Sequence, residues 1–304
     1  MTILLFGKQG QLGRELKNKL RPLGRLIALD KNSSDYCGDF SNLEGLAETI
    51  RNVTPDFVVN ASAYTRVDDA EINPKLASLI NTRATEIIAR ETKKCGGKLI
   101  HFSTDYVFDG SGSHFRDENA LTAPLNVYGR TKLLGDRAVE DTQFESVILR
   151  TSWVYSKHEG NFFKTILNLA MNQSSLRVVD DQIGAPTSTT LIADITYKCL
   201  RRLKVGSSSV KGIYNLASTG ETSRYDYVKY ILKTAREFGL PVTVADANVY
   251  AISSAANNAE AQRPLNSRLD TTKLCSALSV KLPTWQSGVR EIVAILARQN
   301  NIAS

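Results

Sequence analysis

The stretch Thr2-Ile3-Leu4-Leu5-Phe6-Gly7-Lys8-Gln9-Gly10-Gln11-Leu12-Gly13 decides the fold. An apolar run that is typical of a buried strand leads into three glycines with two residues between each, and a helical pattern follows. In such a turn Gly7 permits the tight bend, Gly10 lets backbone amides approach a pyrophosphate, and Gly13 lets the helix pack on the strand. The helix N-terminus then faces the anion. We therefore predict a dinucleotide-binding loop, with a simple helix-capping turn as the alternative.

A second apolar run, Arg25 to Leu29, ends in Asp30, where an acid that binds the ribose of a dinucleotide is expected. Asp30 also begins a stretch rich in Asp, Asn and Ser, so a turn role is the alternative. Lys8 and Lys31 could accept a 2′-phosphate, which the Asp30 carboxylate would repel. The sequence thus leaves both NADH and NADPH open as the coenzyme.

Downstream of this loop, Tyr128 and Lys132 are one helical turn apart and share a helix face. A phenol has a pKa of about 10, and a nearby ammonium favours the phenolate, so the pair suits proton transfer at a carbinol oxygen. The chain holds a second copy of the spacing, Tyr225 and Lys229, within an ordinary amphipathic helical pattern. The glycine loop favours the first copy.

The first half of the chain alternates strand and helix patterns, which predicts an α/β fold, a Rossmann-like doubly wound parallel sheet with helices on both faces. After the two strands already named, we expect further strands at Phe57–Asn60, Lys98–Phe102 and Ser146–Arg150. We expect helices from a capping box at Ser41 to about Asn52, from Pro74 to Lys94, and from Tyr128 to Val139. Residues 1–150 are expected to form the dinucleotide-binding domain.

Beyond Trp153 the pattern loosens, and residues 151–304 are expected to form a smaller substrate-binding portion that is partly interleaved with the first domain. Expected helices are Asn161–Met171, Thr187–Leu203, Ser223–Phe238 and Trp285–Gln299, with short strands at Arg177–Val179 and Gly212–Leu216. The polar stretch Asn248–Ser267 is expected to be a long loop.

Composition agrees with a cytoplasmic enzyme. No run of 18 apolar residues occurs in the 304 residues, so neither a transmembrane helix nor a signal peptide is expected. Four scattered cysteines fit a reducing compartment, and neither they nor the three histidines have metal-ligand spacing, so no metal is expected. The net charge of +7 is dispersed, which favours a small anionic substrate over nucleic acid or a membrane as the partner.

The glycine triplet, the strand end Ser103-Thr104-Asp105-Tyr106-Val107-Phe108 and the Tyr128–Lys132 pair together resemble the extended short-chain dehydrogenase/reductase superfamily. Within it, several segments closely resemble the dTDP-4-dehydrorhamnose reductase family across nearly the whole chain. These segments are Asp35–Phe40, Asn60–Asp68, Ala123–Gly129, Arg150–Tyr155, Asp181–Thr187 and Arg263–Leu269. That family reduces the 4-keto group of dTDP-6-deoxy-L-lyxo-4-hexulose with NADH or NADPH and forms dTDP-L-rhamnose, a precursor of surface polysaccharides.

The resemblance implies roles for individual residues. Tyr128 would protonate the developing C4 alkoxide, Lys132 would lower the Tyr128 pKa and bind the nicotinamide ribose, and Thr104 would bond the ketone oxygen, with a strand-end turn as the alternative for Thr104. The cofactor would contact these residues: Gly7, Gly10, Gln11, Leu12, Gly13, Asp30, Asp39, Phe40, Ala63, Tyr64, Thr65, Tyr128 and Lys132. Asp39 and Phe40 have an alternative role as a loop before the Ser41 cap.

The resemblance also implies a site for the dTDP-linked 4-keto-6-deoxy sugar at Thr104, Asp105, Tyr106, Val67 and Trp153. Trp153 would lie against the sugar or base, with burial in the core as the alternative. Arg263 and Arg268 are candidates for the substrate pyrophosphate, because a guanidinium grips phosphate oxygens in a planar fork, and surface solvation is the alternative.

Some family members are dimers bridged by a divalent ion, so a homodimer is one expectation. Glu15 offers one acidic ligand, but Ser188-Thr189-Thr190 offers hydroxyls where a second acidic cluster would be needed. Three other functions stay open: a reductase that forms the C4 epimer dTDP-6-deoxy-L-talose, a non-catalytic regulatory subunit of the same fold, and an epimerase or dehydratase. The intact Tyr128, Lys132 and Thr104 argue against the regulatory role.

Overall fold

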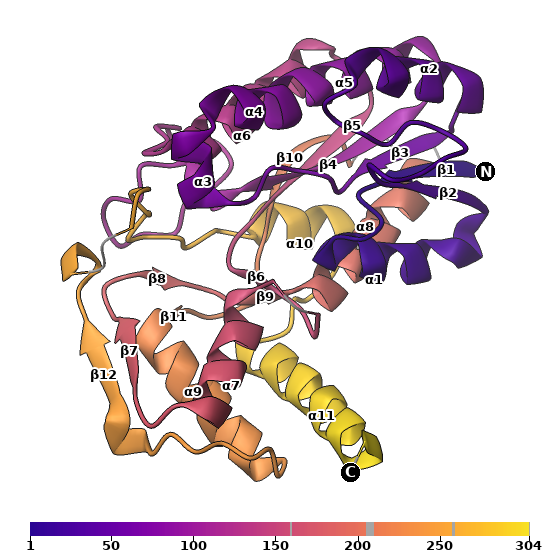
Figure 1. Cartoon of the computed structure of the whole chain (residues 1–304). Coiled ribbons are helices and arrows are strands. Elements are labelled where there is room, and N and C mark those ends of the chain that lie inside the picture. Colours follow the sequence, from indigo (N-terminus) through magenta and orange to yellow (C-terminus); the bar gives the residue numbers. More distant parts are fainter. Residues whose placement is uncertain (159, 205–209, 257–258, 304) are drawn as a thin grey trace.

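The computed structural model describes residues 1–158, 160–204, 210–256 and 259–303. Its centre is a parallel sheet with the strand order β10-β5-β4-β3-β1-β2 (Figure 1). The strands are β1 (Thr2–Phe6), β2 (Arg25–Leu29), β3 (Phe57–Asn60), β4 (Lys98–Thr104), β5 (Ser146–Thr151) and β10 (Gly212–Leu216). Because β1 has β2 on one side and β3 on the other, the order reverses there, and ligands bind at such a switch point. The expected Rossmann-like fold is confirmed, and the glycine loop leaves β1 at the switch point.

Helices cover both faces of the sheet (Figure 1). Side chains alternate along β1, so Ile3 and Leu5 enter the core on one face while Leu4 and Phe6 enter the core on the other. The first face packs against α1 (Gln11–Leu20), α8 (Thr189–Lys204) and α10 (Thr272–Leu278). The opposite face packs against α2 (Leu43–Val53), α5 (Ala84–Lys94) and α6 (Val127–Asp141).

A second lobe lies below the carboxyl ends of the strands (Figure 1). Its core surrounds Tyr227 and is formed mainly by α7 (Phe162–Asn172), α9 (Arg224–Glu237) and α11 (Trp285–Ala303). Three short strand pairs complete this region: β7 (Leu176–Val179) with β12 (Val249–Ile252), β6 (Val154–Tyr155) with β9 (Thr187–Ser188), and β8 (Ile183–Gly184) with β11 (Thr222–Ser223). The chain returns from this lobe to the sheet in α8, β10 and α10.

The expected helix from Pro74 to Lys94 is present but interrupted. It consists of α4 (Pro74–Ser78), a π turn at Leu79–Arg83 and α5. The wider turn contains the buried Asn81, whose side chain accepts from Tyr64 N at 2.8 Å and donates to Tyr64 O at 3.1 Å. Single π turns often occur at functional sites, and this one fixes the backbone between Ala63 and Thr65.

Two local predictions are wrong. The N-cap of α2 is Asn42 rather than Ser41, because the Asn42 side chain accepts from Gly45 N at 2.9 Å. The stretch Asn248–Ser267 is not wholly loop, since β12 pairs with β7 within it; residues 257 and 258 of that stretch lie outside the described residues. Two short helices, α3 (Val67–Ile72) and α10, were not expected from the sequence.

Candidate active site

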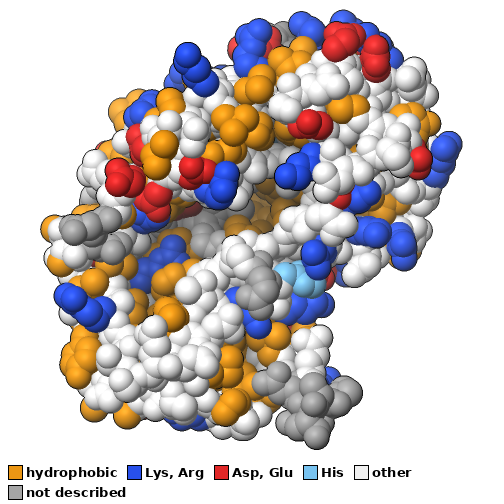
Figure 2. All heavy atoms as spheres, in the orientation of Figure 1, with side chains coloured by type: hydrophobic (Ala, Val, Ile, Leu, Met, Phe, Trp, Pro, Cys, Tyr) orange, Lys and Arg blue, Asp and Glu red, His pale blue; other side chains and the backbone are white. Residues whose placement is uncertain are grey.

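A cavity of about 490 Å³ lies at the carboxyl ends of β1, β3, β4 and β5, between the sheet and the second lobe. Figure 2 shows the corresponding hollow, with Lys or Arg side chains inside it. It brings together many of the residues named from the sequence: Gly10, Gln11, Leu12, Ala63, Thr65, Val67, Thr104, Asp105, Tyr106, Tyr128, Lys132 and Trp153. The first and second halves of the chain thus contribute to one site.

The glycine loop has the geometry that a dinucleotide needs. Gly7 has φ +86°, and a Cβ there would lie 2.7 Å from Ala61 O. A Cβ at Gly13 would lie 1.9 Å from Gly7 O, so helix and loop could not approach as they do. A Cβ at Gly10 would meet only Gly7 O, at 3.4 Å, so the protein's own packing does not require a glycine there.

The N-terminus of α1 opens into the cavity. Its N-cap, Gly10, offers no side-chain hydrogen bond, so the first amides of the helix are not capped by it. Gln11 and Leu12 also line the cavity. Uncapped amides and the positive end of the helix dipole suit a pyrophosphate, so these residues fit the dinucleotide.

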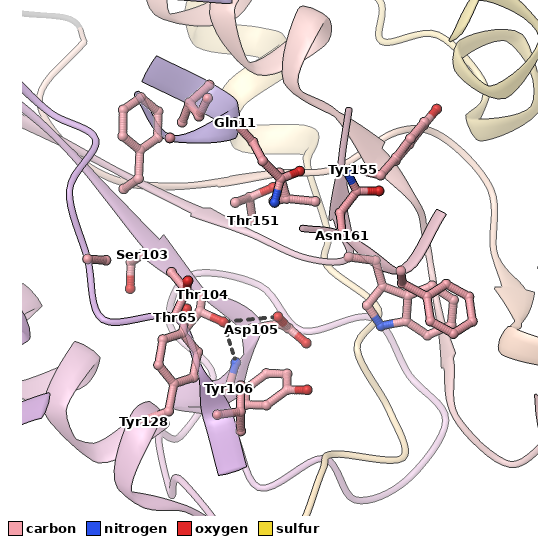
Figure 3. Close-up of a pocket in the computed structure, with 18 of the residues that line it drawn as sticks. Gln11, Thr65, Ser103, Thr104, Asp105, Tyr106, Tyr128, Thr151, Tyr155 and Asn161 are labelled. Carbon is pink, nitrogen blue, oxygen red and sulfur yellow. Dashed lines mark hydrogen bonds between the residues drawn. The ribbon is translucent and has the colours of Figure 1, made fainter. Parts of the chain in front are cut away.

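Thr104, Asp105 and Tyr106 follow one another in the chain beside Tyr128 (Figure 3). Thr104 Oγ1 donates to Asp105 Oδ1 at 3.2 Å and accepts from Tyr106 N at 3.2 Å. The Tyr106 ring lies edge-on to the Tyr128 ring, with centroids 5.5 Å apart. Thr104 ends β4 and Tyr128 lies in the first turn of α6, so a strand end and a helix start direct these two hydroxyls into one cavity.

Burial dominates the electrostatics of Tyr128 and Lys132. Burial raises the pKa of Tyr128 above its ordinary value, and hydrogen bonding with Thr104 opposes this only in part. Lys132 donates to Phe102 O at 2.6 Å, and burial lowers the Lys132 pKa to about 8. The Lys132 amine is thus desolvated and directed toward β4, and its expected effect on the Tyr128 pKa stays a prediction.

Asp105 is a buried carboxylate at the same strand end. Burial raises its pKa to about 6, although hydrogen bonds with Ser267 and Thr104 oppose the shift. Its Oδ2 is buried without a hydrogen-bond partner. An unpaired buried acceptor costs about 1–3 kcal/mol, so this oxygen is a candidate for bonding to a ligand.

Trp153 lines the opposite wall in a strained conformation, with φ +47°. The guanidinium of Arg224 lies 3.7 Å from the Trp153 ring centre and 4.7 Å from that of Phe162. Sequence reasoning missed Arg224, which is the first residue of α9. The feature of the sequence that could have identified Arg224 is a cation in the first turn of a helix, where the helix dipole disfavours positive charge.

Several predicted residues lie outside the lining of this cavity: Gly7, Gly13, Asp30, Asp39, Phe40, Tyr64, Arg263 and Arg268. Asp30 directly follows β2, where its carboxylate lies 3.9 Å from Lys8 Nζ and accepts from Asn32 N. Asp39 Oδ1 accepts from Ser41 N at 2.9 Å in the loop before α2, and its assignment to the cofactor stays a prediction.

The two predicted arginines have protein partners. Arg263 forms a two-pronged ion pair with Asp68 of α3, at 3.1 and 2.6 Å, and Arg268 bonds Glu221 at 2.5 Å. The structure thus places Arg224, rather than these two, in the cavity wall.

The structure also bears on metal and membrane binding. Glu15 lies 3.3 Å from Lys157 Nζ and 3.6 Å from His158 Nε2, so it already has partners within the chain. Among the described residues, no group of three or more His, Cys, Asp or Glu is placed to hold a metal ion. No helix in the described part of the chain is long and apolar enough to cross a membrane.

Comparison with known proteins agrees with the fold. The family model described as RmlD substrate binding domain matches residues 1–298. The chain is 47% identical to dTDP-4-dehydrorhamnose reductase of Escherichia coli K12, covering 96% of this chain and 97% of that protein.

Solved structures give the same result. A dTDP-4-dehydrorhamnose reductase from Bacillus anthracis, in complex with NADP, superposes with TM-score 0.84 and 30% identity over 96% of this chain and 98% of that one. A second one, from Clostridium acetobutylicum, superposes with TM-score 0.87 and 29% identity over 97% of this chain and 99% of that one. Fold, glycine loop and Tyr–Lys pair define a Rossmann-type short-chain reductase. Within that class, the chain belongs to the dTDP-4-dehydrorhamnose reductase family.

Proposed function

We propose that this protein reduces the 4-keto group of dTDP-6-deoxy-L-lyxo-4-hexulose and releases dTDP-L-rhamnose, with NADH or NADPH as the reductant. The carrying observation is that the Tyr128 and Thr104 side chains share a cavity with the uncapped N-terminus of α1. The 47% identity to a reductase of that name over nearly the full chain supports the substrate. When bound, the reduced nicotinamide supplies the hydride.

The protein's own residues handle the proton. Tyr128 donates its phenolic proton to the oxygen of the former ketone, and the phenolate regains a proton from solvent. Thr104 Oγ1 donates a hydrogen bond to the same oxygen, where negative charge develops. The raised pKa of Tyr128 keeps it a phenol at neutral pH, which is the form that a reductase requires.

Binding residues divide between the two parts of the chain. We infer that residues 1–150 hold the dinucleotide through Gly10, Gln11 and Leu12, with Asp30 on the adenosine ribose, and that residues 151–304 hold most of the sugar nucleotide. Arg224 supplies a cation beside Trp153, which suits the pyrophosphate of a dTDP-sugar. The assignment of Arg263 and Arg268 to the same pyrophosphate stays a prediction that truncation to alanine and KM measurement would test.

The test is a coenzyme oxidation assay. The purified protein is mixed with NADH or NADPH and, separately, with the 4-keto sugar, with dTDP-glucose and with UDP-glucose. Absorbance loss with the 4-keto sugar alone is expected. No loss with any sugar would favour the non-catalytic regulatory subunit, and conversion of dTDP-glucose or UDP-glucose would favour a dehydratase or epimerase.

The C4 epimer, dTDP-6-deoxy-L-talose, is the alternative product, because Tyr128, Lys132 and Thr104 can serve either face of the ketone. Orientation of the sugar depends on cavity residues such as Thr65, Val67 and Trp153. Proton NMR separates the products, since H4 of rhamnose is axial and couples strongly to both neighbours, whereas H4 of the talose epimer is equatorial and couples weakly.

We further propose that the enzyme works in the cytoplasm as a homodimer. The cysteines Cys37, Cys95, Cys199 and Cys275 are all free, as a reducing compartment favours. Cell fractionation and light scattering of the purified protein test the compartment and the oligomeric state.

A further inference from the structure

The three residues Ala261, Gln262 and Arg263, which we call the clamp segment, cross the starts of two helices of the first domain. Ala261 N donates to Asp68 Oδ1 at 3.1 Å, and Arg263 forms its two-pronged ion pair with the same carboxylate. Gln262 O accepts from Asn126 Nδ2 at 2.8 Å. Because Asp68 lies in the first turn of α3 and Asn126 is the N-cap of α6, the clamp segment joins these two helix starts.

The start of α6 is held from several sides. Asn126 is 2% exposed, and while its Nδ2 bonds the clamp segment, its Oδ1 accepts from Gly129 N at 2.8 Å. Val127 N donates to Glu71 Oε1 of α3 at 2.7 Å. Tyr128 lies between Val127 and Gly129, so the backbone that carries the phenol is fixed on both sides.

Arg263 also reaches the active site through Tyr106. Its guanidinium is hydrogen-bonded with the Tyr106 side chain. The Tyr106 ring lies edge-on to the Tyr128 ring (Figure 3), and Tyr106 N donates to Thr104 Oγ1. A Cβ at Gly129 would lie 2.2 Å from Tyr106 O, so the first turn of α6 packs directly on the Tyr106 backbone. Tyr106 therefore contacts both side chains that are proposed to act on the ketone oxygen.

The guanidinium of Arg263 already has partners within the chain. Nη1 and Nη2 donate to the two Asp68 oxygens, and Nη1 also donates to Ala261 O at 3.2 Å. Hydrogen bonding with Arg263 holds the pKa of Asp68 below its usual value, so the carboxylate stays charged at neutral pH. Because its planar fork already grips a carboxylate, Arg263 is better placed to support Tyr106 than to bind a phosphate.

We propose that Arg263 is a positioning residue that holds Tyr106, and thereby Tyr128, in place for proton transfer. The inference rests on the proposed role of Tyr128 as the proton donor. Proton transfer depends on alignment, and a displacement of about 1 Å far from the chemistry can cost about 100-fold in rate. Loss of Arg263 should therefore lower the rate of the chemical step through Tyr106 rather than weaken substrate binding.

The first test is a double-mutant cycle on ketone reduction. Arg263→Met and Tyr106→Phe each remove the bond between the two side chains, so each should lower kcat about 10-fold with an unchanged coenzyme Kd. Arg263→Met should cause no further loss in the Tyr106→Phe background, because both changes remove the same contact. A further 10-fold loss there, or a raised KM with an unchanged kcat, would overturn the proposal, since Arg263 would then act without Tyr106.

The matched control is Arg290→Met. Arg290 of α11 pairs with Glu237 of α9 at 2.6 Å, so it also forms a partly exposed ion pair between two elements, but within the second lobe. Its kcat should stay within about twofold of the unmodified protein. A loss equal to that of Arg263→Met would show a general effect of a broken ion pair and would contradict the proposal.

Hydrogen exchange of the protein without sugar or coenzyme is an independent test. In Asp68→Asn, which keeps Arg263 but removes its charged partner, amides around Tyr106 and in the first turn of α6 should exchange at least about threefold faster. Amides of α9 are the internal reference. Unchanged exchange, or faster exchange confined to residues 261–263, would overturn the proposal. Because no sugar is used, this result is separate from the proposed activity, and it decides even if Arg263→Met does not fold.

Discussion

The chain contains two Tyr-x-x-x-Lys pairs on helices, and their surroundings differ completely. Tyr128 lines the cavity, and Lys132 is 1% exposed and bonded to β4. In the second pair, Lys229 is exposed over the Tyr225 ring, and the Tyr225 hydroxyl donates to Val249 O at 3.3 Å. The spacing places both pairs on a helix face, so spacing alone does not show which pair is catalytic.

The environment around each pair supplies the difference. Tyr128 lies in the first turn of α6 beside the strand end of β4, where it is hydrogen-bonded with Thr104. Tyr225 lies in the first turn of α9, whose apolar side packs into the second lobe around Tyr227, and its hydroxyl ties the helix to β12. Burial and polar partners, rather than residue type, separate a catalytic pair from a structural one.

The largest expected effect comes from removing the tyrosine hydroxyl of each pair. Tyr128→Phe removes the proton donor, so kcat should fall by at least about 100-fold, the usual scale of general acid catalysis, with cofactor affinity nearly kept. Tyr225→Phe removes only one hydrogen bond to Val249 O and should leave turnover nearly unchanged. Steady-state rates of NADPH oxidation measure both variants; equal losses would refute the distinction between the pairs.

The next test compares the two lysines. Lys132→Met removes a buried amine that positions Tyr128 and should lower kcat about 10- to 100-fold. Lys229→Met exchanges an exposed side chain and should change kcat little. Circular dichroism must show both variants folded, and a Lys132→Met enzyme of full activity would exclude Lys132 from the reaction.

The carboxylate beside each pair, Asp105 for the first and Asp226 for the second, should affect the free energy of unfolding of the protein differently. The unfolded-state pKa of Asp105 is about 4, and burial raises the folded pKa to about 6, so the charged form destabilises the folded state. This cost is absent below pH 4, grows as pH rises, and is complete above pH 6. Asp105→Asn should therefore raise the free energy of unfolding by about 2 kcal/mol at pH 7.5 and by less at pH 4.

The control for that variant is Asp226→Asn, at an exposed position beside Tyr225. Urea unfolding of Asp226→Asn should differ from the unmodified protein by less than about 0.5 kcal/mol. If Asp105→Asn stabilised the protein more at pH 4 than at pH 7.5, this would contradict the claim that the charged Asp105 destabilises the folded state.

The smallest expected effect concerns Asp30, which lies near the glycine loop that distinguishes the first pair from the second. Asp30 accepts from a ribose hydroxyl but repels a 2′-phosphate, so Asp30→Ala should weaken NADH about fivefold and NADPH less. Fluorescence titration measures both affinities. The reverse order would show that Asp30 does not contact the ribose.

Local sequence patterns were sufficient for the sheet and for much of the cavity. Apolar runs such as Thr2–Phe6 and Phe57–Asn60 are buried strands because both faces of a parallel sheet are covered. Gly7 and Gly13 are identifiable because a side chain there would clash with the backbone. The choice of Tyr128 over Tyr225 depended on the glycine loop upstream and on the family resemblance.

Contacts between distant segments could not be read from the sequence. Arg224 reaches Trp153, Arg263 pairs with Asp68, and Asn81 holds Tyr64 only because segments that are separate in the sequence pack together. The same holds for the desolvation of Lys132, whose amine lies 3.2 Å from His101 Nε2 of β4. Residue spacing predicts a shared helix face, but it does not predict desolvation.

The central claim is that a hydride adds to C4 of the keto sugar while Tyr128 supplies the proton. Reduction with NADPH carrying deuterium at the transferred position of C4 tests it directly, with the product read by NMR. We predict dTDP-L-rhamnose with deuterium at C4 of the sugar, formed at least about 100-fold more slowly by Tyr128→Phe and at the normal rate by Tyr225→Phe. Deuterium at another carbon, or none in the product, would contradict the account.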